Sequence, residues 1–330
     1  MNLSTTYLGL KLAHPLMAGA SPMVDDMGMV KRLEDAGASA IVMHSLFEEQ
    51  ITREEQGTIM DMQLSSNASA EAISFFPQPD DFRLGPEKYL EQVQRIKQAV
   101  AVPVIASLNG TTRAGWLHYG KLMQEAGADA LELNVYYIPT DAKESSSDVE
   151  KRTLDIVRAV KAEVKIPVAV KLSPFFSSLA HFAVELEAAG ADGLVLFNRF
   201  FQPDINVEEL LAEPSLQLSS PSDLLLRLRW LAVLHGHVKG SLAVTGGVHD
   251  GIGALKAVMA GADAVQMVSA LLIHGPERLA QTRADLAEWL EDHDYESLAQ
   301  ARGSMSLVKC PNPQAFTRAN YMRILNGWKP

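Results

Sequence analysis

Hydrophobic and polar residues alternate along the chain in a pattern that predicts eight repeats of a buried strand followed by a helix. Four predicted strands follow a tetrapeptide of the form Ala-Gly-Ala-polar, and each tetrapeptide closes a helical segment. Glycine just past a helix can adopt the left-handed conformation that ends the last turn, and a short apolar run after it is typical of a strand buried on both faces. The predicted strands occupy residues 14–18, 40–42, 102–106, 130–133, 166–170, 193–197, 241–244 and 264–267.

This alternation predicts the α/β class and, within it, a (β/α)8 TIM barrel. The clearest helical segments are residues 27–36, 86–100, 115–126 and 147–164. The last segment begins with Ser147, followed three residues later by Glu150, a spacing that we interpret as a capping box. An open, doubly wound sheet produces the same alternation and is the alternative fold.

Segments outside the repeats predict additions to a single domain spanning residues 1–330. Residues 1–12 contain two short β-type runs and predict an N-terminal hairpin that plugs the bottom of the barrel. Residues 48–84 and 199–220 are too long to be simple connections, and insertions of this kind at the carboxyl ends of strands commonly cover a binding site. Residues 291–330 predict a C-terminal helical extension.

The composition excludes several classes of partner and location. Lys and Arg number 29 against 40 Asp and Glu, so the net charge of −11 disfavours nucleic acid and anionic membranes. The single cysteine, Cys310, excludes an internal disulfide and a metal site built from several thiolates. Because the N-terminus also lacks a signal-peptide pattern, we expect a cytoplasmic protein. The longest apolar stretch, residues 253–276, is interrupted by Lys256 and Asp263, so no membrane span is expected.

In a TIM barrel the functional groups come from the carboxyl ends of the strands. Here those ends carry amides, a lysine and a histidine but no carboxylate, so we expect no metal ion bound through oxygen ligands. Gly246 and Gly247 end the seventh predicted strand and Ser269 ends the eighth, positions at which barrels commonly bind phosphate. Lys171 ends the fifth strand, where we expect its ammonium group at the mouth of the barrel rather than in an apolar core.

These strand ends resemble, over nearly the whole chain, the dihydroorotate dehydrogenase family of FMN-dependent barrels. The matching motifs are Ala18–Ser21, Leu131–Asn134, Val170–Pro174, Asn198, Val244–Gly247 and Val265–Ser269. The resemblance implies FMN as cofactor, with isoalloxazine or other cofactor contacts at Ala18, Gly19, Ala20, Ser21, Asn109, Asn134, Lys171 and Thr245. It also implies that the FMN phosphate lies against Gly246, Gly247, Ser269 and Ala270.

The resemblance further implies a small-molecule substrate, a place in pyrimidine biosynthesis and the cytoplasmic, dimeric class 1 branch of the family. It predicts an oxidoreductase acting on CH–CH donors, with the flavin accepting hydride. A chain with one cysteine cannot ligate an iron–sulfur cluster through four thiolates, so any such electron relay must belong to a separate partner.

The substrate half departs from the family pattern. After the fourth strand the chain runs Asn134-Val135-Tyr136-Tyr137-Ile138-Pro139, and Tyr137 stands where the family has its Cys or Ser base. A phenol with a reference pKa of about 10 is a weak base at neutral pH unless a cation such as Lys171 assists it. His44, with a reference pKa of about 6.5, is the alternative acid or base. The predicted catalytic residues are therefore Tyr137, Lys171 and His44, and the predicted substrate contacts are Asn67, Asn134 and Asn198.

Three functions remain open at this point. The first is an FMN-dependent oxidoreductase acting on dihydroorotate or a related small cyclic amide. The second is a non-catalytic FMN-binding or regulatory protein that kept the flavin pocket after losing its base. The third is a lyase in which Lys171 forms a Schiff base with a phosphorylated substrate.

Overall fold

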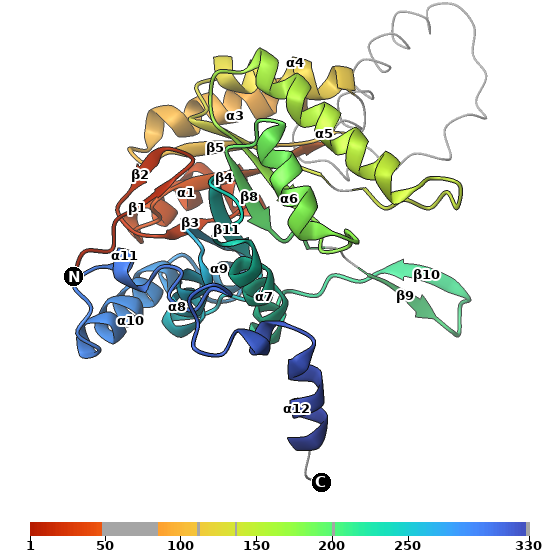
Figure 1. Cartoon of the computed structure of the whole chain (residues 1–330). Helices are drawn as coiled ribbons and strands as arrows, with labels where there is room; N and C mark the ends of the chain where they lie inside the picture. The colour runs from red at the N-terminus through yellow and green to blue at the C-terminus, as the bar shows by residue number, and fades with distance from the viewer. Residues whose placement is uncertain (48–84, 111–112, 136, 200–201, 328–330) are drawn as a thin grey trace, which may run out of the picture.

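A closed barrel of eight parallel strands forms the centre of the computed structural model (Figure 1). The structure describes residues 1–47, 85–110, 113–135, 137–199 and 202–327. Around the barrel the strand order is β11-β12-β3-β4-β5-β6-β7-β8, which excludes the open sheet and confirms the TIM barrel. The strands are β3 (Leu16–Ala18), β4 (Ile41–Phe47), β5 (Val104–Asn109), β6 (Ala130–Asn134), β7 (Val168–Leu172), β8 (Gly193–Leu196), β11 (Ser241–Thr245) and β12 (Ala264–Met267).

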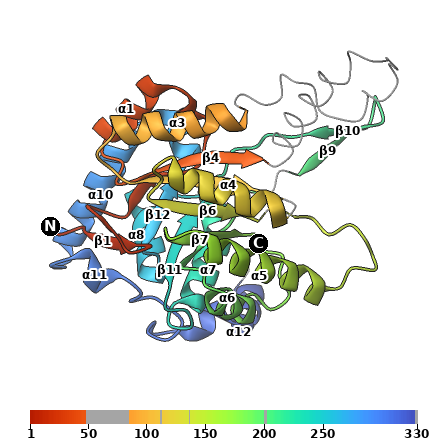
Figure 2. The ribbon, with the colours of Figure 1, turned by 90° about the horizontal axis from the view of Figure 1, so that it is seen from above.

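Helices follow the strands and surround the barrel (Figure 2). Their buried faces pack on the outward side chains of the strands in one large apolar cluster. The α-helices of this layer are α1 (Met27–Asp35), α3 (Pro86–Ala99), α4 (Arg113–Glu125), α5 (Ser146–Glu163), α6 (Leu179–Ala188), α7 (Leu224–Leu234), α8 (Gly251–Ala260), α9 (Ser269–His274) and α10 (Arg278–Asp292). Two short 3₁₀ helices, η1 (Pro22–Asp25) and η3 (Pro221–Asp223), precede α1 and α7.

The capping box of α5 lies two residues before the predicted one. The Ser145 hydroxyl accepts from the Asp148 N–H, and the Asp148 carboxylate accepts from the Ser145 N–H. The prediction from Ser147 and Glu150 was therefore wrong. Three consecutive serines precede Asp148, and the shorter Asp side chain serves as well as Glu at the third helical position.

The N-terminal hairpin closes the bottom of the barrel, as predicted. Strands β1 (Thr5–Tyr7) and β2 (Leu10–Leu12) pair antiparallel, and Leu8 donates its N–H to the Ser241 hydroxyl at 2.9 Å, where β11 begins. The side chains of Tyr7, Leu8 and Leu12 pack on small residues inside the barrel such as Ala130. The polar strand ends therefore lie at the opposite end.

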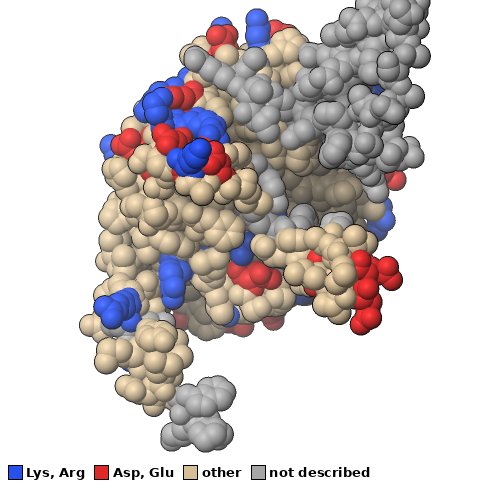
Figure 3. Space-filling view, turned by 90° about the vertical axis from the view of Figure 1, so that its right-hand side faces the viewer, with Lys and Arg blue, Asp and Glu red and all other residues tan. Residues whose placement is uncertain are grey.

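Two elements project from the barrel in different directions (Figure 1), and both can be seen from the side in Figure 3. Within the predicted insertion at residues 199–220, β9 (Pro203–Asn206) and β10 (Leu211–Pro214) form an antiparallel hairpin. The C-terminal extension contains α11 (Leu298–Ala301), the 3₁₀ helix η4 (Pro313–Phe316) and α12 (Ala319–Gly327). The predicted insertion at residues 48–84 lies outside the described residues. In the described parts of the chain, every helix is too short or too polar to cross a bilayer.

Candidate functional site

The carboxyl ends of β4, β5 and β6 join with the segment after β8 in a network of amide and hydroxyl groups. The Ser45 and Ser107 hydroxyls lie 2.8 Å apart. Asn134 donates from Nδ2 to Ser45 Oγ at 3.1 Å, and Asn198 donates from Nδ2 to Asn134 Oδ1 at 2.6 Å. The structure thus brings Asn134 and Asn198 together, while Asn109 is buried at the end of β5. Fixed amides of this kind suit a planar ligand with amide edges.

Directly beneath this network lies a buried ion pair, of which the sequence analysis predicted only one partner. Lys171 donates from Nζ to Glu132 Oε1 at 3.0 Å, and Gln266 donates from Nε2 to Glu132 Oε2 at 2.6 Å. Glu132 and Gln266 are fully buried, and Lys171 is 6% exposed. A sequence signal existed, because a charged residue inside the apolar run Leu131-Glu132-Leu133 requires a buried partner.

The barrel interior also holds polar atoms that have no hydrogen-bond partner among the described residues. These atoms are the Gln266 side-chain oxygen and the Tyr7 hydroxyl. Burial, with the negative charge of Glu132 as a smaller cause, raises the pKa of Tyr7 well above its ordinary value. The Tyr7 hydroxyl therefore stays neutral, and the Glu132–Lys171 pair supplies the charge inside the barrel.

The loop after β11 and the loop after β12 both contact Ser219, a residue that the sequence analysis did not predict as part of the site. Gly246 and Gly247 have φ angles of +86° and +85°, which favour glycine. A Cβ on Gly247 would lie 2.4 Å from the Leu224 nitrogen, so the backbones approach too closely for any side chain. Gly247 donates its N–H to Ser219 Oγ at 3.1 Å, and Ser219 Oγ donates to Ser269 Oγ at 2.8 Å. Ser219 thus lies between the two loops predicted to bind phosphate.

A buried arginine supports the same glycine loop from behind. Arg227 donates from Nε to the Thr245 carbonyl oxygen at 2.5 Å and from Nη1 to the Asp223 carbonyl oxygen at 2.7 Å. Burial lowers the pKa of Arg227 from its ordinary value, although a guanidinium remains charged at neutral pH. The loop therefore combines backbone N–H groups, serine hydroxyls and a nearby positive charge, which is the chemistry of an anion site.

The segment after β3 is fixed against β12. Gly19 donates its N–H to the Met267 carbonyl oxygen at 2.9 Å, and a Cβ on Gly19 would lie 2.6 Å from Val268 Cγ2. Glycine is therefore required at this position if the two strands are to approach. The neighbouring residues Ala18, Ala20 and Ser21 continue from β3 at the same end of the barrel.

Of the two predicted bases, His44 lies in a bulge of β4. The register of β4 against β5 shifts between Val42 and Ser45. The His44 ring lies edge-on to the Tyr89 ring of α3, with 5.3 Å between centroids, and its Nδ1 is 2.9 Å from Asp25 Oδ1 of η1. The next residue, Ser45, joins the amide network. The Asp25 carboxylate on η1 therefore fixes the orientation of the His44 ring.

Tyr137, the other predicted base, contacts a surface ion pair. Its hydroxyl donates to Glu144 Oε2 at 2.7 Å, and the Arg152 guanidinium lies 4.5 Å from the centre of its ring. Glu144 and Arg152 pair with each other. The hydrogen bond with Tyr137, with the charge of Glu144, raises the pKa of Arg152. The cation beside the phenol is thus Arg152, whereas the sequence suggested Lys171.

Two further sequence predictions concern a substrate contact and the absence of a metal ion. Asn67, the predicted substrate contact, lies in the segment outside the described residues. Within the residues that the structure describes, no group of three or more His, Cys, Asp or Glu side chains is arranged to hold a metal ion.

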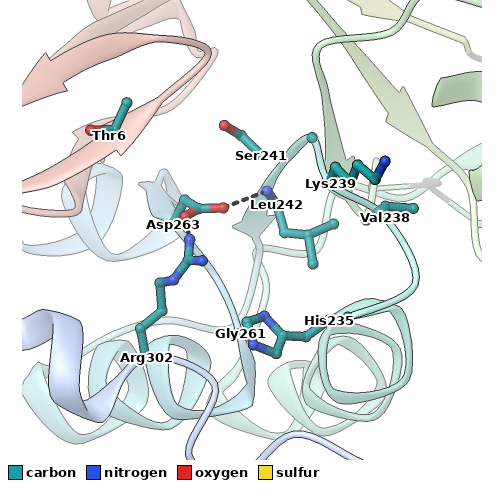
Figure 4. Close-up of a pocket in the computed structure, with 11 residues that line it drawn as sticks. Thr6, His235, Val238, Lys239, Ser241, Leu242, Gly261, Asp263 and Arg302 are labelled. Carbon is teal, nitrogen blue, oxygen red and sulfur yellow. Dashed lines mark hydrogen bonds and ion pairs between the residues drawn. The ribbon is translucent and has the colours of Figure 1, made fainter.

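A pocket of about 390 Å³ lies at the opposite end of the barrel, beside the N-terminal hairpin (Figure 4). Asp263 accepts from the Leu242 N–H at 2.8 Å and pairs with Arg302 across the pocket. Burial, together with the charge of Arg302, lowers the pKa of His235 in the wall. Because Asp263 and Arg302 of this wall pair with each other at the amino ends of the strands, we assign this end to stability.

Comparison with known proteins gives matches over nearly the whole chain. The family model described as dihydroorotate dehydrogenase matches residues 2–290. The chain is 27% identical over 308 residues to the protein named "Dihydroorotate dehydrogenase B (NAD(+)), catalytic subunit" of Thermoplasma volcanium, covering 92% of this chain and 98% of that protein. It is 23% identical over 329 residues to "NAD-dependent dihydropyrimidine dehydrogenase subunit PreA" of Escherichia coli K12, covering 92% and 76%.

Proposed function

Because the chain belongs to the dihydroorotate dehydrogenase family, we propose that it is an FMN-dependent oxidoreductase acting on the CH–CH unit of a small cyclic amide. Dihydroorotate and a dihydropyrimidine are the two substrate candidates, since the names of its relatives refer to both. The observation that carries the proposal is the buried Lys171 ammonium beneath the network of Asn134 and Asn198, because it combines one positive charge with fixed amides.

The residues present fit FMN. Lys171, Asn109 and Asn134 would meet the isoalloxazine ring together with the segment Ala18–Ser21, and the Gln266 oxygen offers a buried acceptor without a partner. The phosphate would lie against Gly246, Gly247, Ser269 and Ala270, beside the Ser219 hydroxyl. When bound, FMN supplies a two-electron acceptor for hydride.

The chain's own residues would divide the remaining work. Asn134 and Asn198 orient the amide groups of the substrate, and Lys171 holds positive charge beneath them. Tyr137 takes a proton from the substrate carbon while its own hydroxyl proton passes to Glu144, with which it is hydrogen-bonded at 2.7 Å. Arg152 pairs with Glu144 and lies over the phenol ring, so it holds these two side chains in place.

The Schiff-base alternative receives no support from the geometry around Lys171. A Schiff base requires an unprotonated amine, whereas the buried Glu132 carboxylate pairs with the ammonium form at 3.0 Å. The non-catalytic alternative retains the same flavin contacts and differs only in predicting no reduction by substrate.

Electron transfer away from the flavin requires a partner in this proposal. The relatives are named as a catalytic subunit and as subunit PreA, which implies assembly with other chains. With a single cysteine, this chain cannot supply an iron–sulfur relay of four thiolates. We therefore propose a separate electron-transfer subunit or a soluble acceptor.

The first experiment is an anaerobic visible spectrum of the FMN-reconstituted chain before and after addition of dihydroorotate or dihydrouracil. We expect flavin absorbance that disappears with one of the two substrates. Retained flavin that neither substrate bleaches would support the non-catalytic alternative. A chain that takes up no FMN would contradict the proposed cofactor, and borohydride trapping of Lys171 would then become the next test.

We also propose that the chain forms a homodimer through its two projecting elements. The β9–β10 hairpin exposes four apolar side chains at 57–86% of their surface: Ile205, Val207, Leu210 and Leu211. The same hairpin carries four acidic residues: Asp204, Glu208, Glu209 and Glu213. Helix α12 exposes four side chains at 57–67% of their surface: Tyr321, Met322, Ile324 and Leu325. Arg323 lies in the same helix, and Arg318 directly precedes it. The two surfaces have opposite charge and both project from the barrel (Figures 1 and 3), so two copies can exchange them reciprocally.

Neither element is stable alone in water. An isolated two-stranded hairpin is marginally stable, and α12 has only nine residues. We expect the unmodified chain to have the mass of a dimer by light scattering, and Ile324→Asp to have that of a monomer. Ile252→Asp, a matched change on the exposed part of α8, should leave the dimer intact. A monomeric unmodified chain, or a dimer that survives Ile324→Asp, would contradict this interface.

A further inference from the structure

The Glu132 carboxylate connects two opposite parts of the barrel wall. Its Oε1 accepts from Lys171 Nζ on β7 at 3.0 Å, and its Oε2 accepts from Gln266 Nε2 on β12 at 2.6 Å. Glu132 and Gln266 are completely shielded from solvent. With both oxygens engaged, the carboxylate has one orientation, and the Lys171 ammonium is fixed in turn.

The strand register leaves room for this arrangement. Glu132 and Asn134 are two residues apart on β6, so their side chains enter the barrel on the same face. Asn134 lies beside Lys171 across the β6–β7 pair, and Glu132 lies beside Ala169. Because Ala169 is small, the lysine side chain can reach the carboxylate one layer below the amide network. The Lys171 ammonium therefore lies between the Glu132 carboxylate and the layer of side chains that contains Asn134.

Stability does not explain why a charged pair occupies this position. Other residues inside the barrel, such as Ala130, Val195 and Ala243, are apolar and buried. Replacing a buried ion pair by apolar residues of similar volume is often neutral or stabilising. A buried carboxylate that is paired with a lysine at the candidate site therefore points to a role exerted through that lysine.

We propose that Glu132 is a positioning residue that holds the Lys171 ammonium at the proposed FMN site and offsets part of its positive charge, thereby setting the reduction potential that FMN would have there. This inference rests on the proposed FMN site. A lysine without a counter-charge would favour the anionic, two-electron reduced flavin more strongly than the pair does. Gln266 contributes by fixing the second carboxylate oxygen.

The test is the equilibrium between oxidised and reduced FMN on the purified chain, measured against a reference dye with xanthine and xanthine oxidase as the electron source. Glu132→Gln keeps the shape of the side chain and removes its charge. We expect the ratio of reduced to oxidised FMN at a fixed potential to rise at least tenfold, which for a two-electron couple corresponds to about 30 mV. Should Glu132→Gln fail to fold, Glu132→Asp, which moves the charge away from Nζ, should shift the ratio in the same direction.

Two comparisons separate this role from a structural one. Asp263→Asn removes another buried carboxylate that is paired with a cation, at the opposite end of the barrel (Figure 4), and should leave the ratio within twofold of the unmodified chain. The double variant Glu132→Gln with Lys171→Met removes both charges, and because Glu132 offsets only part of the lysine charge, the ratio should fall to the unmodified value or below it.

Two results would overturn the inference, and a third would count against the proposed function. Retained FMN with an unchanged ratio in Glu132→Gln would overturn the inference. A double variant that keeps the raised ratio would also overturn it, because Glu132 would then act independently of Lys171. Failure of the unmodified chain to bind FMN would instead count against the proposed function itself.

Discussion

Lys171→Met is expected to destabilise the folded chain by about 3–5 kcal/mol, because it leaves a buried carboxylate without its cation. Glu132 is fully shielded, and after the change Gln266 would be its one remaining donor among the side chains that the structure describes. The measurement is urea-induced unfolding of the flavin-free chain, followed by the FMN content of the reconstituted protein, which should also fall. Adding Glu132→Gln to this variant should recover most of the lost free energy, since no charge then remains buried.

The matched control for this prediction is Lys97→Met. Lys97 donates from Nζ to Asp129 Oδ2 at 2.6 Å, but both side chains are partly exposed, at 34% and 25%. An ion pair screened in this way contributes about 0–1 kcal/mol. Equal losses of unfolding free energy in Lys97→Met and Lys171→Met would contradict the buried charge pair inside the barrel.

Tyr137→Phe is expected to slow the substrate-dependent reduction of the flavin by about 10²–10⁴-fold, the usual effect of losing a general base. The change removes the hydroxyl that Glu144 accepts from and leaves the ring beneath Arg152 in place. FMN content should stay the same, because Tyr137 lies in the loop after β6 and not in the glycine loops. Anaerobic stopped-flow spectroscopy with saturating substrate measures the rate.

The comparison variants for Tyr137 are Tyr321→Phe and His44→Asn. Tyr321 is an exposed tyrosine on α12, so its change should leave the rate of flavin reduction unaltered. His44, whose ring faces Asp25 at 2.9 Å, is the other predicted base. A large rate loss in His44→Asn with a normal rate in Tyr137→Phe would transfer the base role to the histidine and its carboxylate.

Local sequence patterns determined the architecture of this protein. The Ala-Gly-Ala-polar corners gave the phase of strands and helices, because a glycine that ends a helix and an apolar run that follows it are both short-range signals. Once the strands were located, their carboxyl ends followed, and with them Lys171, Asn134 and Gly247 as candidate site residues. The barrel topology then required these ends to meet at one mouth.

Helix termini were less well determined by sequence. The capping box of α5 uses Ser145 and Asp148, whereas the pattern favoured Ser147 and Glu150. Consecutive serines can each cap a helix, and the packing of α5 on the barrel decides which of them does so.

Only the tertiary structure decided which polar groups meet. Glu132 is 39 residues from Lys171 and 134 residues from Gln266, yet all three form one buried cluster. Ser219 reaches Ser269 across 50 residues, and the bulge in β4 gives His44 and Ser45 different partners. Periodicity along the chain reports which face of a strand is buried. The register between strands and the bulges that alter it determine which side chains touch, and these depend on packing around the closed barrel.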